Sequence, residues 1–449
     1  MDNYKLYTGG LAETVPNPSL LTYSFLKHWF NTNNSLGRAL DILQLPHLKS
    51  DEPIITRIDT QLYIDLQKEE SVLYRPTIFA YKNSSNPSLT PQLTISPLKI
   101  FSIKNLSNTL KILTKQSEWI AHPEKVIQKA QELDQAVSPV VQPSNEKTDQ
   151  YLSEVAWPHT IAIGMLAEFY THLLNSYKLP TEAKEKITQY ITQQTSHTDW
   201  IIQSLRDMAK VKSGEFALNQ YMHEYGLRAD QDYELATPRW IEQPDLMQQR
   251  IDQSTRFSES PTIELSLPEN IQKIVETIIT LQTLRTSIRK KMLPHINQLR
   301  LAALKKYGPK YDFNTTTREL LLFNQSNTQT DEIPITQPIL TSYEQQGKGL
   351  EISAGIVRAK VKHITNSLEE IPAQTICIFP NASPEFSIQF PKAMGIIFLI
   401  GGQTSHGAIV TREYKIPALA DANAKNIPDN TEIEINGTTG DWKIIPPRS

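Results

Sequence analysis

Apolar residues recur at the spacing of an α-helix through the first two thirds of this chain. The clearest stretches are residues 150–177, which Pro158 interrupts, residues 182–212, and residues 268–307, where Pro294 predicts a kink. An apolar residue at every third or fourth position gives each helix one face to bury. We therefore predict that this part of the chain is mainly helical.

The pattern changes near the C-terminus, where nine of the 16 glycines follow residue 346. Five short apolar runs, each bounded by turn residues, predict strands there: residues 355–361, 375–379, 395–399, 417–419 and 432–435. Only residues 405–414 show a clear helical pattern in this region. These features indicate a small α/β domain.

Polar segments divide the chain. Residues 76–97 and 137–148 are rich in Pro, Ser and Asn and predict loops. Residues 324–346 are polar, lack glycine and contain two prolines, which predicts an extended linker or an ordered surface loop. The predicted fold class is an α+β multidomain chain, with a mainly helical body over residues 1–323 and a small α/β domain over residues 347–446.

Composition narrows the function classes that fit. The chain has 449 residues, and its 45 basic and 48 acidic residues give a net charge of −3, which provides no sign of a nucleic-acid footprint or a polybasic membrane patch. The single cysteine, Cys377, excludes an intramolecular disulfide and fits a reducing compartment. No apolar run approaches the roughly 20 residues of a membrane helix, and the N-terminus lacks signal-peptide features. We expect a cytoplasmic protein without nucleic-acid or membrane partners, and no residue stands out as a metal ligand.

The strongest candidate for chemistry lies in residues 401–420, GGQTSHGAIVTREYKIPALA. The glycine pair ending at Gly402 predicts a tight turn, and Thr404 or Ser405 can cap the helix that follows. His406 then falls in the first turn, where unpaired N–H groups and the helix dipole favour a phosphoryl group and disfavour the imidazolium. Such a neutral ring can act as a nucleophile, although a histidine after a glycine turn is also compatible with a structural or simply exposed side chain.

The same segment resembles the phosphohistidine "swivelling" domain of the PEP-utilising enzymes, a family that includes phosphoenolpyruvate synthase, pyruvate phosphate dikinase and rifampin phosphotransferase. The family pattern is GG-x-x-SH-x-A-I-x-A-R-E-x-x-IPA, and Thr411 replaces its usual second alanine. Residues 353–359, 379–396 and 436–440 resemble the opening, middle and closing parts of that domain, so the resemblance covers residues 347–446. It implies that His406 carries phosphate within a catalytic set that comprises His406, Thr404, Ser405 and Gly402.

Other signature residues have different expected roles. Thr404 is the neighbour that we expect to touch the phosphoryl group. Arg412 and Glu413 lie about two turns into the helix. We expect them to form an ion pair within the domain, or to contact the part on which it docks, rather than to act in catalysis.

The body resembles the central helical domain of rifampin phosphotransferase-like enzymes. Residues 225–228 (YGLR) and 234–240 (ELATPRW) are similar to its Y-G-H-R…E-L…P-R-W segment, with Leu227 in place of histidine. Residues 9–16 and 61–66 resemble two earlier stretches of that domain. Three charged residues then either line an acceptor pocket or form a structural ion-pair set: Arg228, Glu234 and Arg239.

A second group of cations lies on the predicted long helix. Arg285 and Arg289 are four residues apart and share a face. They resemble the cations of the R-E-x-x-K pattern near the acceptor hydroxyl in these enzymes, but Thr286 replaces the glutamate. The change removes a carboxylate that could accept a proton from the acceptor, which puts hydroxyl activation in doubt or indicates a different acceptor. A solvated helix face is the alternative for both arginines.

The resemblance also implies partners. Multidomain relatives have an ATP-grasp domain before the central domain, whereas this sequence opens at the central domain and has no G-x-x-x-x-G-K-[ST] loop. We therefore expect a phosphotransferase component that a separate ATP-grasp protein charges, with ATP and Mg²⁺ bound on that partner and no cofactor held by this chain. His406 would pass the phosphoryl group to a small molecule in the body. The alternatives are a phosphorelay protein charged by phosphoenolpyruvate and a non-catalytic binding protein.

Overall fold

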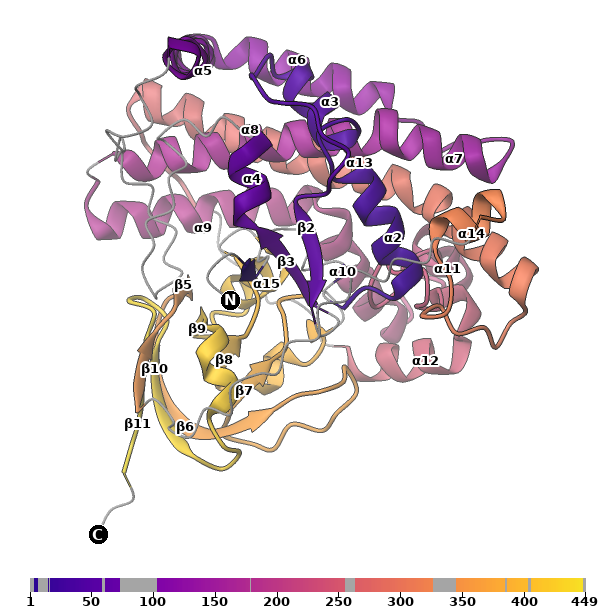
Figure 1. Ribbon diagram of the computed structural model, residues 1–449. Helices are drawn as coiled ribbons and strands as arrows, with labels where there is room; N and C mark the ends of the chain where they lie inside the picture. Colours follow the sequence, from indigo (N-terminus) through magenta and orange to yellow (C-terminus); the bar gives the residue numbers. More distant parts are fainter. Residues whose placement is uncertain are drawn as a thin grey trace.

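The computed structural model describes residues 4–6, 15, 17–58, 61–72, 103–177, 179–254, 263–325, 345–383, 386–402 and 405–446. The predicted loop at 76–97, most of the predicted linker, most of residues 9–16 and Thr404 lie outside the described residues. Helices fill most of the first part of the chain and a large sheet fills the last part (Figure 1). The fold class is therefore α+β, as the sequence predicts.

The helical body also contains a small antiparallel sheet, in the order β1-β3-β2. Its strands are β1 (Tyr4–Leu6), β2 (Ile55–Ile58) and β3 (Gln61–Asp65). The helices are α2 (Leu20–Trp29), α3 (Ser35–Ile42), α4 (Leu66–Val72), α5 (Ile103–Ala121), α6 (Pro123–Ala136), α7 (Asn145–Tyr151), α8 (Trp157–Ser176), α9 (Thr181–Thr198), α10 (Trp200–Lys212), α11 (Leu218–Tyr225), α12 (Pro244–Gln253), α13 (Glu269–Tyr307) and α14 (Arg318–Phe323).

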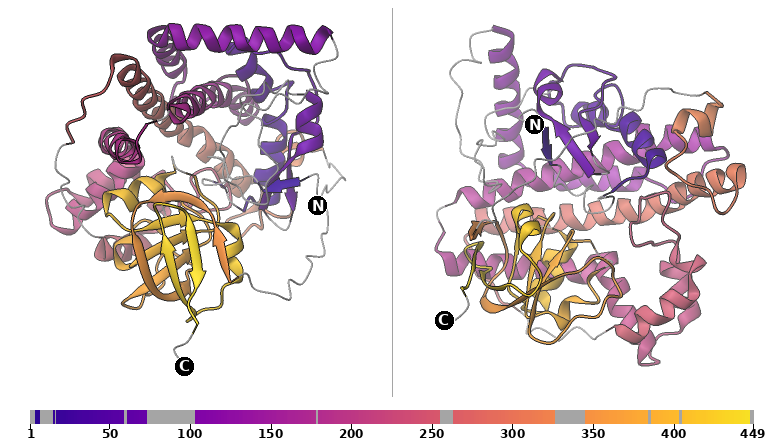
Figure 2. Two further views of the ribbon diagram at one scale, coloured as in Figure 1. Left: turned by 90° about the vertical axis from the view of Figure 1, so that its left-hand side faces the viewer. Right: turned by 60° about the horizontal axis from the view of Figure 1, so that its bottom comes forward.

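The long helix α13 and helix α8 pack along each other at the centre of the body, with α3 against α8 and α6 against α13 (Figure 2). Their apolar faces supply fully buried side chains such as Ile163 of α8 and Ile288 of α13. α13 stays helical across Pro294, although proline removes one helix hydrogen bond. Burial of two amphipathic faces therefore holds the centre of the body together.

The stretch that Pro158 interrupts is helical on both sides of that residue. A π-helical turn, Leu152–Ala156, joins α7 to α8. Pro158 closely follows this π-turn, and the backbone before it is helical, with Ala156 at φ −69° and ψ −49°. The wider turn accommodates a residue that has no N–H to donate.

The predicted helix over residues 182–212 is wrong at one point, because the structure divides it into α9 and α10 at Asp199. This residue has an extended backbone, with φ −71° and ψ 113°. Its Oδ1 accepts hydrogen bonds from the N–H groups of Ile201 (2.8 Å) and Ile202 (3.1 Å). Asp199 is therefore an N-cap that starts a second helix, and continuous apolar spacing on both sides conceals the break.

The C-terminal strands form one eight-stranded sheet in the order β4-β11-β10-β6-β7-β8-β9-β5. The strands are β4 (Gln346–Lys348), β5 (Leu350–Ser353), β6 (Ile356–His363), β7 (Thr375–Phe379), β8 (Gly395–Phe398), β9 (Ala418–Ala420), β10 (Glu432–Asn436) and β11 (Asp441–Ile444). β6, β7, β8 and β9 are parallel neighbours, and the outer pairs are antiparallel. The five strands predicted from apolar runs are confirmed as β6 to β10.

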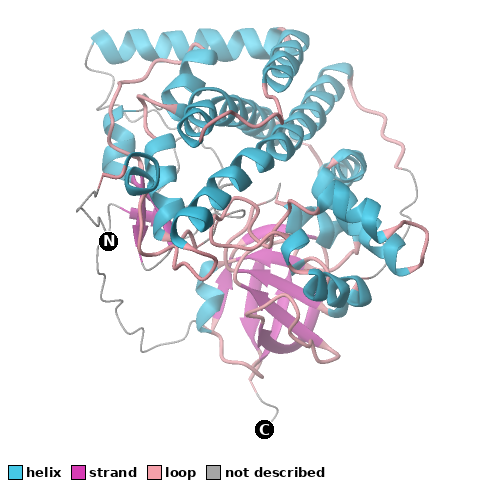
Figure 3. Cartoon of the chain, turned by 90° about the vertical axis from the view of Figure 1, so that its right-hand side faces the viewer, coloured by secondary structure: helices cyan, strands magenta, loops and turns pink. Residues whose placement is uncertain are grey.

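Helix α15 (His406–Glu413) follows β8 and lies between the sheet and the helical body (Figure 1). Figure 3 shows the large sheet beneath the helices of the body. It contacts β5 on the sheet side and both α9 and α10 on the body side. One hydrophobic cluster includes residues from both parts, among them Ile202 of α10 and Ala408 of α15. The packing thus brings the start of α15 against the break between α9 and α10.

Candidate functional site

The first turn of α15 presents the candidate histidine. Ser405 is the N-cap, one of the two residues that the sequence offers for this position, and its hydroxyl accepts a hydrogen bond from the N–H of Ala408 at 3.0 Å. The N–H of Ser405 donates to the carbonyl of Gly402 at 3.1 Å, which closes the turn before the helix. His406 is the first helical residue and is 5% exposed.

His406 meets Asp199 across the interface between the sheet and the body. Its Nε2 lies 3.1 Å from Oδ2 of Asp199, and both side chains are buried. Because an ionised carboxylate can only accept, Nε2 must carry the proton in this contact. In the described part of the chain, the buried Nδ1 of the same ring has no hydrogen-bond partner.

The Asp199 carboxyl is held in its charged form. Burial acts to raise its pKa, but the His406 charge and hydrogen bond, together with the N–H groups of Ile202 and Ile201, outweigh burial and lower the pKa to about 2. At neutral pH the group is therefore a buried carboxylate whose charge depends on its partners.

Sequence reasoning missed Asp199 entirely. The signal that could have found it is local, because an Asp that precedes an apolar helical run is a standard N-cap pattern. That pattern predicts a helix start, but it contains nothing that pairs residue 199 with residue 406. Only the docking of the two parts shows the pairing.

Thr286, the residue that replaces the family glutamate, lies beside this pair. Its Oγ1 is 3.2 Å from Oδ2 of Asp199 and 3.1 Å from the carbonyl of Gln282, one turn back in α13. A carboxylate is therefore present next to this position, although it comes from α10 rather than α13.

Arg285 and Arg289 lie on the same helix as Thr286. Arg289 is 8% exposed, so a solvated helix face does not describe it. Arg285 is half-buried beside α8, where a Cβ on Gly164 would lie 3.9 Å from its Cδ. Burial raises the pKa of Tyr233 above its usual range, and the charges of Arg289 and Arg285 oppose that rise. The charges of both guanidinium groups therefore act on a buried residue of the body.

The other three charged candidates lie in a tightly bonded loop between α11 and α12. Glu234 accepts hydrogen bonds from the N–H (3.0 Å) and hydroxyl (2.6 Å) of Ser19 and from the hydroxyl of Thr22 (2.8 Å), which fixes the start of α2. Arg239 donates to the carbonyl of Asp232 at 2.8 Å, and burial lowers its pKa to about 10.

Arg228 is equally enclosed. It pairs with Asp232 at 3.5 Å, donates to the hydroxyl of Ser204 and lies over the Trp240 ring at 4.5 Å. Arg228, Glu234 and Arg239 are each at most 3% exposed, and the contacts described above join them to other groups of the body. These contacts fit a structural ion-pair set, which is one of the two roles that the sequence suggests for these residues. A role in acceptor binding stays a prediction.

A second contact crosses the same interface. Glu413 accepts a hydrogen bond from the hydroxyl of Ser196 at 3.0 Å and lies 3.8 Å from Arg206. Arg412 instead turns inward and donates to the carbonyl of Ile352 at 2.7 Å, where burial lowers its pKa to about 10. Glu413 therefore contacts the body, whereas Arg412 bonds within the sheet domain to a backbone group.

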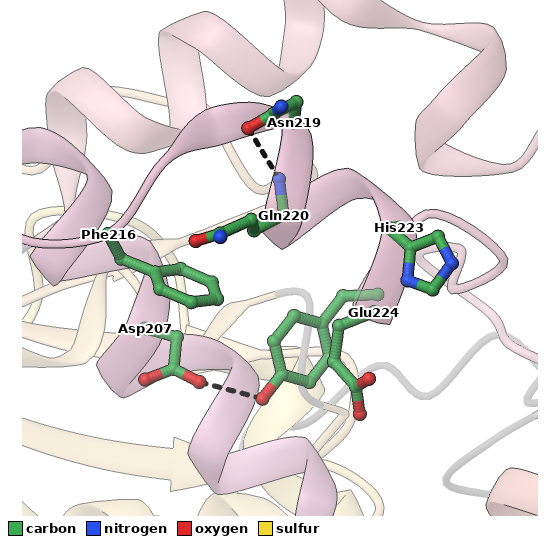
Figure 4. Close-up of a pocket in the computed structure, with 7 residues that line it drawn as sticks. Asp207, Phe216, Asn219, Gln220, His223 and Glu224 are labelled. Carbon is green, nitrogen blue, oxygen red and sulfur yellow. Dashed lines mark hydrogen bonds between the residues drawn. The ribbon is translucent and has the colours of Figure 1, made fainter.

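The body has a surface cavity of about 650 Å³ between α10 and α11 (Figure 4). Its lining residues are Asp207, Phe216, Asn219, Gln220, His223, Glu224 and Tyr225. Both carboxylates are already paired, Asp207 with Lys210 at 2.7 Å and Glu224 with Lys290. None of the predicted site residues lines this cavity, so it gives no support for an acceptor site.

Two further properties concern the part of the chain that the structure describes. None of its helices is both long and apolar enough to cross a membrane. No group of three or more His, Cys, Asp or Glu side chains that could hold a metal ion is found there.

Comparison with known proteins finds a similar domain for a segment of each part of the molecule. Residues 371–440 match the mobile domain of PEP-utilising enzymes, and residues 181–299 match the fourth domain of rifampicin phosphotransferase. Each of the two parts is therefore similar to a domain of the PEP-utilising enzymes.

Curated relatives agree with this assignment. The rifampicin phosphotransferases of Streptomyces sviceus and Bacillus cereus are 23% and 22% identical to this chain over 311 residues. Each alignment covers 54% of this chain and 36% of the relative, so the match spans about a third of those proteins. The rifampicin phosphotransferase of Bacillus subtilis is 30% identical over 100 residues, which are 22% of this chain and 12% of the relative.

Proposed function

We propose that this chain is a phosphotransferase component that carries a phosphoryl group on His406 and passes it to a small molecule bound by the helical body. The observation that carries the proposal is the position of His406. It begins a helix, and its Nε2 points at the body beside the cation-bearing helix α13.

The chemistry of phosphoryl transfer matches this placement. The reaction depends on in-line positioning and on positive charge around the transferred group more than on covalent help from the protein. Arg285 and Arg289 on α13 flank Thr286, which lies within hydrogen-bond distance of the partner of His406. His406 begins α15, so the positive end of that helix dipole adds a further favourable field for the phosphoryl group.

We infer the phosphoryl donor and the acceptor from the resemblance to the PEP-utilising enzymes. We propose that a separate ATP-grasp protein binds ATP and Mg²⁺ and charges His406, and that the sheet domain then moves against the body for transfer. The relatives are named for phosphorylating rifampicin, which makes a hydroxyl-bearing small molecule the acceptor class that we favour.

The first test uses a chemical phosphoryl donor that can react without the proposed ATP-grasp protein. The purified chain is treated with ³²P-labelled phosphoramidate, and we expect an acid-labile, base-stable label on His406. His406→Ala should abolish this label, whereas His223→Ala, which removes an exposed histidine of α11, should not. The same variants are then compared with labelled ATP and an ATP-grasp protein from the same organism.

The outcomes separate the alternatives. Label from ATP only in the presence of the ATP-grasp protein would support a split phosphotransferase. Label from phosphoenolpyruvate without that protein would favour a phosphorelay. If no donor labels His406, the chain is a binding protein and the proposed function is wrong.

A further inference from the structure

The replacement of the family glutamate removes a carboxylate from α13, but the structure places another carboxylate, that of Asp199, beside the altered position. Thr286 stands in that glutamate's place on α13, and its Oγ1 is 3.2 Å from Oδ2 of Asp199. The same oxygen of Asp199 is 3.1 Å from Nε2 of His406. One carboxylate oxygen thus contacts both the altered position and the nitrogen that faces the body.

We propose that Asp199 transfers a proton from the acceptor hydroxyl to Nε2 of His406 during phosphoryl transfer. The inference rests on the phosphotransferase function proposed above and names a catalytic residue for that function. Asp199 qualifies because it contacts a reacting atom directly, and because its position is fixed independently of any ligand.

The proposed step balances. The acceptor oxygen attacks phosphorus while its proton passes to the Asp199 carboxylate. The bond between phosphorus and Nε2 breaks, and its electron pair stays on Nε2. Asp199 then gives the proton to Nε2, which leaves a phosphorylated acceptor, a neutral imidazole and an ionised carboxylate. The N–H to carboxylate contact in the structure is the arrangement that remains after this step.

The two oxygens of Asp199 are suited to separate tasks. Oδ1 accepts hydrogen bonds from the N–H groups of Ile201 and Ile202, which holds the side chain at the start of α10. Oδ2 faces His406 and Thr286. The N-cap hydrogen bonds of Asp199 therefore hold its other oxygen toward His406 as a proton acceptor. A carboxylate on α13 is not needed for this role.

Phosphorylation of His406 should make the Asp199 carboxylate a stronger base, as the proposed proton transfer requires. Burial acts to raise the pKa of Asp199, and the contact with His406 is the main influence that lowers it. When a phosphoryl group replaces the proton on Nε2, that contact is lost and a dianion takes its place. The carboxylate consequently becomes a stronger base in the phosphorylated state, which is the state that must accept the acceptor's proton.

The experiment measures transfer to water, which is the smallest hydroxyl acceptor and is present in every buffer. The full chain is charged with labelled phosphoramidate, freed of donor, and followed for loss of label from His406 in H₂O and in D₂O. Asp199→Asn and Asp199→Ser remove the proton acceptor, but both keep a side chain that caps helices well. Glu413→Gln is the matched control, because Glu413 crosses the same interface through Ser196 without contacting His406.

We expect both Asp199 variants to lose label at least about tenfold more slowly than the unaltered chain, since general acid–base groups contribute about 10² to 10⁴ in rate. The solvent isotope effect of the unaltered chain should also disappear in them. Glu413→Gln should keep both the rate, within about threefold, and the isotope effect. Thermal unfolding of each variant verifies that the fold is intact.

Three results would overturn the inference in distinguishable ways. Unchanged rates and isotope effects in both Asp199 variants would show that Asp199 moves no proton, while the proposed function would stand. Equal slowing in Glu413→Gln would assign the effect to docking. Equal labelling of the unaltered chain and of His406→Ala would instead reject the proposed function itself.

Discussion

At the scale of single residues, the unusual feature is a buried charge with several partners. An unpaired buried carboxylate is strongly unfavourable, and Asp199 avoids this because two backbone N–H groups, a hydroxyl and an imidazole surround it. Three of these partners belong to the body and one belongs to the sheet domain. The charge therefore links the stability of the interface to the state of His406.

This carboxyl should make stability depend on pH at the acid end. Its pKa falls from 3.8 to about 2 on folding. A carboxyl with a lowered folded pKa stabilises the fold fully above its ordinary value and loses this contribution as the pH falls toward the folded value. The resulting difference in free energy of unfolding between the unaltered chain and Asp199→Asn, about 2 kcal/mol, should disappear between roughly pH 4 and 2.

Urea unfolding of both proteins at several pH values measures this difference. Asp421→Asn serves as a control, because Asp421 is a buried cap within the sheet domain that bonds Trp442 and lies away from the histidine. A difference that stays constant from pH 6 to pH 2 would contradict the expected coupling.

At the scale of elements, two glycines in helices illustrate how packing decides what a substitution does. Gly407 lies in the first turn of α15, where its N–H donates to the carbonyl of Ala382 at 3.1 Å. A Cβ there would lie 2.8 Å from the Cβ and 2.9 Å from the carbonyl oxygen of Ala382. Gly164 lies inside α8, where a Cβ would meet only Arg285 at an ordinary contact distance.

The same change should therefore have opposite effects at these two positions. Gly407→Ala should destabilise the chain by about 1–3 kcal/mol, because the helix must move away from Ala382. Gly164→Ala should stabilise it by up to about 1 kcal/mol, because alanine is the better helix former and finds space. Chemical denaturation of both variants checks the prediction, and a stabilised Gly407→Ala would show that the turn yields easily.

At the scale of the whole molecule, the sheet domain is held to the body by one apolar cluster and a few polar contacts. Among the described residues these contacts include His406 with Asp199, Glu413 with Ser196 and Arg206, Arg250 of α12 with Ser367 at 2.8 Å, and Lys392 with Gln253 at 3.3 Å. The carrier role that we propose requires the sheet domain to leave one site and reach another, so these contacts must break during the movement.

Weakening one contact should loosen the docked position. Glu413→Ala removes the acceptor of Ser196 and should increase amide hydrogen exchange in the last turn of α9 and the first turn of α15, with a cost of about 1–2 kcal/mol. Glu432→Gln is the matched control, because Glu432 pairs with Arg358 at 2.8 Å on the exposed side of the sheet. Unchanged exchange in α9 for Glu413→Ala would mean that the remaining contacts of the interface hold the domain without Glu413.

The sequence by itself determined the parts of the molecule whose signals are local. Apolar spacing identified the long central helix and the strands β6 to β10, because each buries one face along a regular repeat. The turn and cap chemistry around Ser405 placed His406 at a helix start. The resemblance to the PEP-utilising enzymes came from the same contiguous segment.

Only the tertiary structure decided which distant groups meet. Asp199 and His406 are 207 positions apart, and nothing in either local pattern pairs them. The break at Asp199 was hidden by apolar residues on both sides, and the enclosure of Arg228 and Arg239 depends on a loop whose bonds are specific to this fold. Local patterns fix helices and strands because these use neighbouring hydrogen bonds, whereas a buried charge is satisfied by whatever the packing of the two parts brings beside it.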